Sequence, residues 1–451
     1  MKLLHLGVHR SVAWQCRKYG QNTATKKSQE KFGNARVSAD IFKYFQSHNK
    51  LDLLKLFPEK LFRRKQKLPL TYYIANEKTA KLVADTVTSN LPKGITLAEI
   101  NPGPGLLTKE LLNRDVSKLV LFEANSEFRR NLEPDRVKVQ IGDFLSLWKL
   151  HFQDKLDNGS RLDWLLRDVP RKDYCDDVNM RLVGAVGYYD FFKHLIISLT
   201  FQMSITSYGR SEMYLILPPP LYIHLTCCND IGYQFYRAMS FLFQIMFEYR
   251  FIARLPREHF LPWRYEQNLS KGSKQIKVVI LQVKSINPEF LYLVKIVPRK
   301  NLYDLCPPED MPAMWYFIKQ NCISRKNRVI PNLERWIPGC GSRLIINLNQ
   351  PKPVQQLYPD EDIDNLPPFT KPCTTMCTRD YYPGMNIFTE FGDLTPSQML
   401  SLFSQFRSWP EYKDSLFLAS LENSLLKLET SSEERVDGLE ITEEDLRKRE
   451  K

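Results

Sequence analysis

The sequence has no apolar run long enough to cross a lipid bilayer. Its most apolar stretch, residues 238–253, is interrupted by Gln244, Glu248 and Arg250. It therefore falls short of the roughly 20 apolar residues that a membrane span needs. We expect no membrane span, and we predict an amphipathic helix in this stretch.

The cysteines form no recognisable pattern. Nine of them are spread irregularly over 451 residues. Cys227 and Cys228 are adjacent, and Cys373 and Cys377 have no His or Cys partners at the spacing typical of zinc sites. A disulfide framework and a metal site are both disfavoured, so we expect free thiols in a reducing compartment.

Acidic residues are missing before Glu30. That segment mixes apolar residues with six basic ones, namely Lys2, Arg10, Arg17, Lys18, Lys26 and Lys27. This composition resembles a mitochondrial transit peptide, which we predict over residues 1–30 and which implies the mitochondrial matrix and its nucleoid. An ordinary basic arm is the alternative. A basic N-terminal arm is predicted over residues 31–70.

The whole chain is basic, with a net charge of +13 and a pI of about 9.1. Such a balance suits a polyanionic partner such as nucleic acid, although a basic leader or a need for solubility would produce it too. The apolar fraction of 43% fits a globular protein, and the length fits two to three domains.

A strand, a glycine turn and a helix follow one another near position 100. Leu97–Ile100 has the pattern of a short buried strand, Asn101–Gly105 that of a tight loop, and Leu106–Leu112 that of a helix. Gly103 and Gly105 permit positive φ and close approach of a ligand to the backbone. The loop is Gly-Pro-Gly and not a full G-x-G-x-x-G, so a dinucleotide is not the expected ligand.

Two acidic residues stand at the ends of the next two predicted strands. Glu123 ends the strand 118–123, where a carboxylate can accept hydrogen bonds from a ribose diol. Asp143 follows the strand 137–141, where it can accept from an adenine amine. Three strand-end signals in this order favour a nucleoside-containing ligand.

Alternating strands and helices continue to residue 285. Residues 146–180 are charged and irregular, and we predict a surface insertion there. The remaining predicted elements are strands at 181–186, 212–217 and 276–284 and helices at 188–208 and 233–252. We predict an α/β fold with a doubly wound, mostly parallel sheet over residues 71–285.

The pattern changes in the last third of the chain. A small helical C-terminal domain is predicted over residues 286–348. A Pro-rich and acidic C-terminal extension follows over 349–451, with helices between Thr395 and Leu428. We predict disorder from Glu429 onward.

These residues resemble a known family. The run Glu99–Thr108, then Glu123 and then Gly142–Leu145, is similar to the S-adenosylmethionine-dependent rRNA adenine dimethyltransferases. The resemblance implies the methyltransferase fold and an S-adenosyl-L-methionine cofactor. It also implies roles for five residues: Asn101 and Gly103 at the methionine end, Glu123 at the ribose, Asp143 at the adenine, and Ile74 as a further contact.

The catalytic motif departs from the family. Members carry Asn-Leu-Pro-Tyr after the fourth strand, where the Asn accepts a hydrogen bond from the target amine and the Tyr stacks on the flipped base. The matching run here is Ala185-Val186-Gly187-Tyr188. Ala185 has no acceptor and Gly187 lacks the rigid φ of proline. Tyr188 keeps the stacking side chain, and Asp190 is an alternative acceptor.

A second resemblance lies further along the chain. Ile296–Tyr303, Trp315–Phe317, Cys322 and Arg325 are similar to the mitochondrial transcription factor B branch of the same family. Members of that branch help mitochondrial RNA polymerase to open promoters. The resemblance implies a basic surface that contacts melted promoter DNA or the polymerase, formed by Arg299, Lys300, Arg325, Lys326 and Arg328.

Two hypotheses follow from these resemblances. In the first, the protein is a mitochondrial transcription initiation factor in which the cofactor site is vestigial. In the second, it is a mitochondrial small-subunit rRNA adenine N6-dimethyltransferase that uses the cofactor. The degenerate motif at Ala185–Tyr188 favours the first, and the retained Gly103, Glu123 and Asp143 favour the second.

Overall fold

The computed structural model describes thirteen stretches of the chain, which are residues 30–32, 35–37, 42, 45–47, 51–58, 71–92, 94–114, 116–132, 137–187, 189–233, 235–261, 289–346 and 363–437. The predicted transit peptide up to residue 29 and the predicted strand at 276–284 lie outside these residues. Among the helices within them, none combines the length and hydrophobicity needed to cross a membrane.

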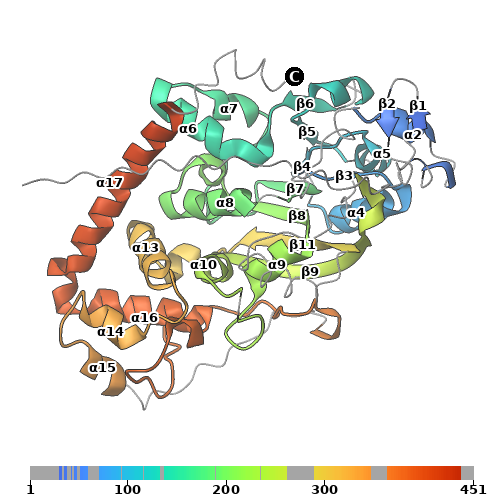
Figure 1. Ribbon diagram of the computed structural model, residues 1–451. Helices are drawn as coiled ribbons and strands as arrows, with labels where there is room; N and C mark the ends of the chain where they lie inside the picture. The colour runs from blue at the N-terminus through green and yellow to red at the C-terminus, as the bar shows by residue number, and fades with distance from the viewer. Residues whose placement is uncertain are drawn as a thin grey trace, which may run out of the picture.

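A seven-stranded sheet forms the centre of the molecule (Figure 1), with the strand order β6-β5-β4-β7-β8-β11-β9. The strands from β6 to β8 are parallel, and β11 is antiparallel to both β8 and β9. Their bounds are β4 Thr96–Ile100, β5 Leu119–Glu123, β6 Lys138–Ile141, β7 Met180–Ala185, β8 Ser211–Leu217, β9 Phe247–Pro256 and β11 Phe290–Pro298. The predicted fold class, a doubly wound and mostly parallel α/β sheet of the methyltransferase type with a C-terminal helical region, is confirmed.

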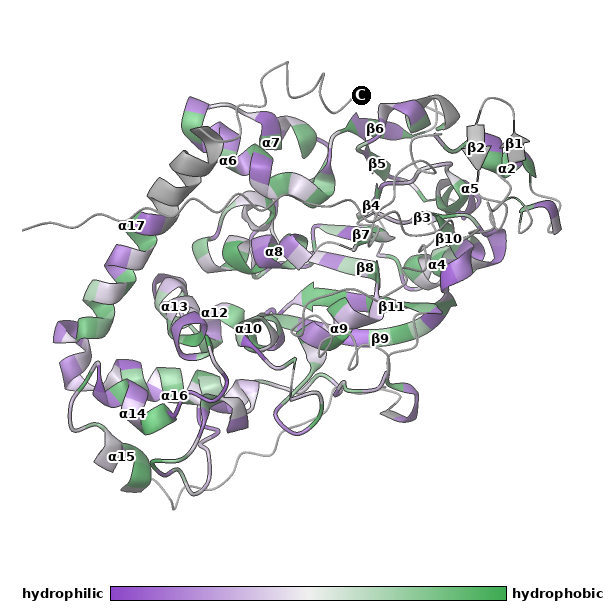
Figure 2. Ribbon diagram, viewed as in Figure 1, coloured by the Kyte–Doolittle hydropathy of each residue, from purple (hydrophilic) through white to green (hydrophobic). Residues whose placement is uncertain are grey.

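Alternate residues of the strands face two separate hydrophobic cores, because successive side chains of a strand point to opposite faces of the sheet. Leu97 and Leu121 join one core with helices α4 (Glu77–Thr88) and α5 (Leu106–Leu112). Ala98 and Phe122 join the larger core with α8 (Tyr189–Phe201), α9 (Pro219–Thr226) and α10 (Ala238–Met246). The central strands are therefore buried on both faces and mostly apolar, with Glu99, Arg181 and Glu212 as buried charged exceptions; Figure 2 colours the sheet by hydropathy.

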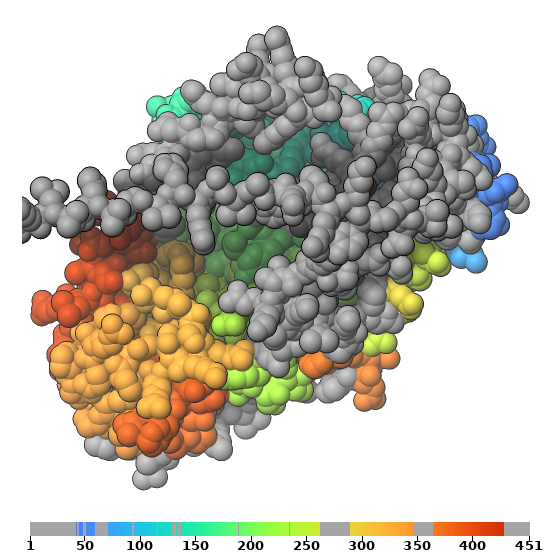
Figure 3. All heavy atoms as spheres, in the orientation of Figure 1, coloured from blue at the N-terminus to red at the C-terminus, as the bar shows by residue number. Residues whose placement is uncertain are grey.

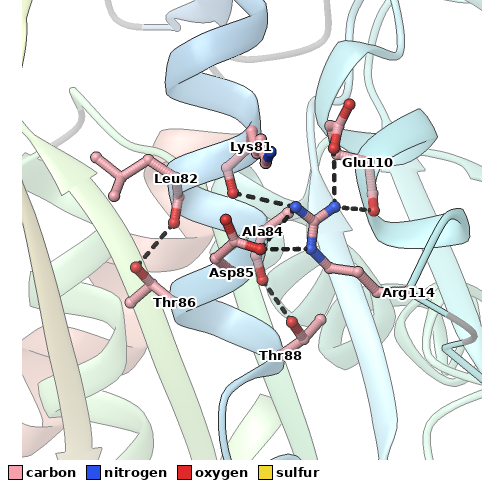
Figure 4. A network of polar contacts seen from close by, with 8 residues as sticks. All are labelled: Lys81, Leu82, Ala84, Asp85, Thr86, Thr88, Glu110 and Arg114. Atoms are coloured by element: carbon pink, nitrogen blue, oxygen red, sulfur yellow. Dashed lines mark hydrogen bonds and ion pairs between the residues drawn. The ribbon is translucent and has the colours of Figure 1, made fainter.

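Helices α4 and α5 are tied together by one arginine (Figure 4). Arg114, just after α5, donates from Nε and Nη2 to Asp85 Oδ1 of α4, at 2.9 and 2.7 Å. Its Nη1 donates to Glu110 Oε2 at 2.8 Å. The Asn76 side chain caps α4 by accepting from Thr79 N at 3.2 Å. This arrangement fixes the helix that follows the glycine loop against its neighbour.

Two predicted segments differ from the structure. The predicted helix at 233–252 ends at Met246, and β9 begins at Phe247. Phe247 and Tyr249 are buried, whereas Glu248 is partly exposed and Arg250 is exposed. This alternation is the two-residue period of a strand. The predicted irregular insertion at 146–180 contains two helices, α6 (Leu147–Asp157) and α7 (Arg161–Leu165).

The C-terminal half completes both the sheet and the larger core. The predicted domain boundary at residue 285 needs correction, because β11 pairs with β8 in the central sheet. The following helices are α12 Leu302–Leu305, α13 Met311–Asn321, α14 Val329–Glu334, α15 Gly341–Ile346, α16 Pro396–Ser408 and α17 Leu416–Asp437. Phe403 and Phe406 of α16 pack their rings against Phe317 of α13. The prediction of disorder from Glu429 is wrong as far as Asp437, where α17 ends.

Several smaller elements lie outside the central sheet. Strand β3 (Tyr73–Ile74) pairs with β10 (Phe260–Leu261). Near them, a third cluster of buried residues includes Phe45, Tyr73 and Phe128. The other elements are β1 Glu30–Phe32, β2 Ala35–Val37 and α2 Leu51–Lys55.

Candidate functional site

The glycine loop joins β4 to α5 in a conformation that ordinary residues rarely adopt. Asn101, Gly103 and Gly105 all have positive φ, at 50°, 58° and 80°. A Cβ on Gly103 would lie 2.5 Å from Cδ1 of Tyr73. Glycine is thus required at 103 both for its backbone angle and for the space that the Tyr73 ring occupies. The sequence analysis missed Tyr73, and no local pattern marked it.

Glu123 holds the loop from the end of the neighbouring strand. Its Oε2 accepts from Gly103 N at 3.0 Å and its Oε1 from Asn125 N at 2.7 Å. The residue is only 1% exposed. Burial raises the pKa of Glu123 to about 7, against the opposing effect of the backbone N–H groups of Asn125 and Gly103, while nearby Asp143 adds to the rise. The site is therefore poised between a neutral and a charged carboxyl at neutral pH.

A second carboxyl lies beneath the same loop. Glu99 of β4 accepts a hydrogen bond from Thr108 Oγ1 of α5 at 2.8 Å. Burial raises the pKa of Glu99 to about 8, the Thr108 hydrogen bond opposes the rise, and the nearby Glu123 adds to it. The sequence analysis assigned Glu99 no role of its own. Its contact with Thr108 ties the start of α5 to β4.

Asn101 offers a buried acceptor in the glycine loop. The residue is buried, and within the described part of the chain its Oδ1 has no hydrogen-bond partner. Buried polar atoms normally have partners. A donor group of a bound molecule would satisfy this oxygen, so the loop fits a ligand that carries an amine or hydroxyl group.

Asp143 stands at the end of β6 beside a cavity of about 760 Å³. Its Oδ1 accepts from Leu145 N at 3.1 Å and its Oδ2 from Ser146 Oγ at 2.5 Å. The far wall of the cavity comes from α6 and α7, the segment predicted to be an irregular insertion. Gly103 and Glu123 do not line this cavity, which extends from the Asp143 side of the site toward the surface.

The five predicted cofactor residues therefore have the following places. Asn101, Gly103, Glu123 and Asp143 meet at the carboxyl ends of β4, β5 and β6. Ile74 is buried in β3, next to the Tyr73 that contacts Gly103. Their roles toward a cofactor stay predictions.

The degenerate motif lies at the end of the next strand. Ala185 is the last residue of β7 and is buried, and Val186 N donates to Ile216 O at 2.9 Å. Tyr188, the predicted stacking residue, lies outside the described residues. Asp190 is exposed and forms an ion pair with Lys193 at 2.8 Å.

A tyrosine–histidine pair that the sequence analysis missed follows this motif. The Tyr189 hydroxyl lies 3.0 Å from His224 Nε2 of α9. Burial lowers the pKa of His224 to about 4, and Arg237 contributes in the same direction. Burial likewise raises the pKa of Tyr189 to about 12. Both groups are therefore neutral at pH 7.

The predicted basic surface is only partly a surface. Arg299 is 1% exposed, and its guanidinium donates to Gln244 O and Thr374 O, each at 3.0 Å. The prediction that Arg299 contacts nucleic acid needs correction, because its side chain braces the interior. Lys300, Lys326 and Arg328 are exposed. Arg325 is partly buried, with its guanidinium 4.0 Å from the Tyr233 ring centre.

Comparisons with known proteins identify related sequences and structures. The model of a family described as ribosomal RNA adenine dimethylase matches residues 65–357. A Drosophila melanogaster protein named dimethyladenosine transferase 2, mitochondrial, is 53% identical over 401 residues, which cover 86% of this chain and 88% of that protein. The Mus musculus protein of the same name is 24% identical over 274 residues, covering 58% of this chain and 66% of that protein. A solved dimethyladenosine transferase from Plasmodium falciparum aligns at a TM-score of 0.41 and 14% identity, over 74% of this chain and 97% of that one.

The sheet order and the glycine loop define a methyltransferase-type α/β protein. Within that class, the chain belongs to the ribosomal RNA adenine dimethylase family.

Proposed function

We propose that this protein is a mitochondrial transcription initiation factor that helps mitochondrial RNA polymerase to melt promoter DNA, built on the fold of an rRNA adenine dimethyltransferase. The observation that carries the proposal is the buried methyl group of Ala185 at the end of β7, where the family places the asparagine that accepts from the target amine. Loss of one preorganised polar partner of a transition state typically costs about 10²–10³ in rate.

We propose that the glycine-loop site binds S-adenosyl-L-methionine. The site is either vestigial or in use. Asn101 and Gly103 would line its methionine end, Glu123 would accept from its ribose and Asp143 from its adenine, with Ile74 alongside. The residues fit this group, because Asn101 Oδ1 is a buried acceptor without a partner in the described part of the chain. The Glu123 carboxyl also has lone pairs beyond its two backbone donors. When bound, the cofactor would supply an electrophilic methyl group.

The partners we propose are mitochondrial promoter DNA and mitochondrial RNA polymerase. The supporting features are the net charge of +13 and the exposed side chains of Lys300, Lys326 and Arg328. Basic side chains that neutralise phosphates supply most of the non-specific affinity for nucleic acid. Arg325 is proposed only as a partial contributor, since its guanidinium also packs on Tyr233.

The decisive experiment is transcription from a linear mitochondrial promoter by purified mitochondrial RNA polymerase, with and without this protein. We expect transcripts to depend on the protein and to persist with Glu123→Ala, which removes the proposed ribose acceptor. Circular dichroism and thermal melting of the variant check its fold. Loss of transcription from a folded Glu123→Ala variant would reject the factor hypothesis as stated here.

The alternative function is a mitochondrial small-subunit rRNA adenine N6-dimethyltransferase. It is favoured by the complete set of Asn101, Gly103, Glu123 and Asp143 and by the names of the relatives. Transfer of a labelled methyl group to a small-subunit rRNA hairpin tests it. Transfer that disappears with Glu123→Ala supports the enzyme, whereas counts at background reject it.

We also propose a mitochondrial location, with residues 1–30 as the transit peptide. The basic, acid-free leader and the mitochondrial names of the relatives support this location. Fusion of residues 1–30 to a fluorescent protein should direct that protein to mitochondria, and a diffuse signal would contradict the assignment.

A further inference from the structure

An aromatic side chain stands uncovered next to the exposed basic residues. Phe388 is 65% exposed and its neighbour Ile387 is 52% exposed. They lie at the tip of a turn in the C-terminal segment. Residues 300–346 and this later segment form neighbouring parts of one face of the molecule (Figure 3). Two adjoining apolar side chains that project from one turn present an apolar surface to solvent.

The turn that presents Phe388 is held by hydrogen bonds of its own. Asn386 Oδ1 accepts from Phe388 N at 2.8 Å, and Thr389 Oγ1 accepts from Asn386 N at 3.0 Å. Gly384, at the start of the turn, has a φ of 70°. The backbone that carries Phe388 is therefore fixed, and its ring is presented without a large ordering cost on binding.

The turn is also anchored to the loop between α13 and α14, where the basic residues lie. Val329 N donates to Thr389 O at 2.9 Å, and Phe391 N donates to Asn327 O at 2.8 Å. Arg328 and Glu390 form an antiparallel bridge. These bonds set the position of Phe388 relative to the basic loop.

The surroundings of the ring are cationic. The Arg328 guanidinium lies 5.1 Å from the Phe388 ring centre. Lys326 is exposed two residues earlier, and within the described part of the chain neither Arg328 nor Lys326 takes part in an ion pair. The carboxylate of the turn, Glu390, is occupied by the Tyr233 hydroxyl at 3.0 Å.

We infer that Phe388 is a stacking platform for an unpaired nucleobase, with Arg328 and Lys326 contacting the adjacent phosphates. The ligand class is single-stranded nucleic acid, because an unpaired base offers a free π face and a phosphate offers the charge that the two cations lack. A base inside a duplex is already stacked on both sides. The inference rests on the proposed function and extends it to one aromatic contact with the melted strand.

The test measures binding of the full chain to a labelled single-stranded oligonucleotide and to the matched duplex, by fluorescence anisotropy at several salt concentrations. Phe388→Ala and Phe388→Leu should each weaken single-strand binding by about 5- to 150-fold, the range expected for one lost stacked base. Phe388→Tyr and Phe388→Trp should stay within about twofold of the wild type. Duplex binding should change little in all four variants.

The salt dependence separates stacking from charge. Phe388→Ala should leave the slope of log affinity against log salt unchanged, since it removes no charge. Arg328→Ala should reduce that slope by about 0.7, the value for one phosphate contact on a single strand. Leu82→Ala is the matched control, because Leu82 is an apolar side chain that is 46% exposed and belongs to another element, α4.

Other outcomes overturn the inference. Wild-type affinity in Phe388→Leu would mean that the π face is not used. Intact single-strand binding by Phe388→Ala, together with weakened binding to the polymerase, would make the turn a protein-docking site. In either case, weakening by Lys326→Ala and Arg328→Ala would leave the proposed function standing. A wild-type protein that neither binds single strands nor supports transcription would reject both proposals.

Discussion

At the scale of single residues, the glycine loop and the start of α5 are held by two carboxyl groups that are costly to ionise. Glu99 and Glu123 lie under the glycine loop, and burial raises the pKa of both above that of an exposed glutamate. Glu99 accepts from Thr108 of the following helix α5, and Glu123 accepts from the backbone of Gly103 in the loop after the neighbouring strand β4. The hydrogen bonds that hold the glycine loop therefore depend on whether the carboxyls of Glu99 and Glu123 are protonated.

The Glu123 carboxyl should make stability depend on pH. Its pKa is about 7 in the folded protein against 4.5 for an unperturbed glutamate. The Glu123 carboxyl is mostly protonated below pH 4.5 in both the folded and the unfolded state. As the pH rises, it ionises first in the unfolded chain. The carboxyl therefore disfavours folding increasingly up to about pH 7, by about 3 kcal/mol in all. Denaturant unfolding at pH 5 and pH 8 should show Glu123→Gln gaining stability relative to the wild type at the higher pH.

The control for this measurement is Glu127→Gln, which changes an exposed carboxyl four residues away. This variant measures the effect of removing one carboxylate from this part of the surface. A wild-type-minus-variant difference for Glu123→Gln that does not change between pH 5 and pH 8 would show that burial does not raise the pKa of Glu123 in the folded state.

Gly103 should tolerate no side chain. Gly103→Ala places a Cβ 2.5 Å from the Tyr73 ring at a φ of 58°, whereas Gly94→Ala has a φ of 80° and no atom within 4 Å. Gly94→Ala should cost about 1–2 kcal/mol from backbone strain alone. Gly103→Ala should cost about 1–3 kcal/mol more from overpacking. Urea titrations of the two variants measure the difference, and Tyr73→Leu should recover part of the Gly103→Ala loss; equal losses would exclude a clash with Tyr73.

At the scale of elements, strands that are buried on both faces were predictable from their apolar runs. The strands β4 to β8 lie within about one residue of their predicted bounds, because each is framed by a turn or a charged residue. The α10–β9 junction was not predictable in this way, since the mostly apolar stretch 238–247 passes from helix to strand without a turn residue or a proline between them. The burial of Arg299 was not predictable from local sequence either, because its partners Gln244 and Thr374 come from distant segments.

The site residues also divide into those that a local pattern could locate and those that depend on tertiary contacts. Gly103, Glu123 and Asp143 lie at strand ends and could be located from local pattern. Tyr73 could not, because its contact with Gly103 depends on the pairing of β3 with β10. The position of the exposed Phe388 beside Arg328 likewise depends on an anchored turn that no local pattern indicates.

The α4–α5 clamp should contribute modestly to stability. Arg114→Ala removes the charged hydrogen bonds to Asp85 and Glu110, and we expect a loss of about 1 kcal/mol because Asp85 is largely exposed. Asp85→Ala should cost less in the Arg114→Ala background than in the wild type. Lys109→Ala, an exposed cation on the same helix α5, is the control. Strictly additive losses in this double-mutant cycle would mean that the two helices are not coupled through Arg114.

At the scale of the whole molecule, the C-terminal segment belongs to the core. Phe406 of α16 is fully buried and packs against Phe317, Trp336 and Phe417. The C-terminal extension predicted over 349–451 thus contributes aromatic side chains to the larger hydrophobic core. The Thr395–Gln398 capping box fixes the start of its helix.

Phe406→Ala should therefore destabilise the entire protein. We expect a loss of about 3–5 kcal/mol in the free energy of unfolding, the usual cost of deleting a buried phenylalanine ring. Phe388→Ala is the matched control and should change stability by about 0.5 kcal/mol or less, because its ring is exposed. Denaturant unfolding followed by circular dichroism measures both. A small loss for Phe406→Ala would mean that the C-terminal segment unfolds separately from the sheet.

The place of β11 in the sheet orders the maturation of a chain that leaves the ribosome N-terminus first. Strands β4 to β8 are complete once Leu217 has been made, yet the free edge of β8 is covered only after Pro298 has followed. The aromatic residues of α16 arrive later still. During that interval the chain has an unpaired strand edge and an apolar core surface that α16 has not yet covered. Both promote association with other chains. A chain in which β11 and α16 have not yet packed therefore needs protection by a chaperone.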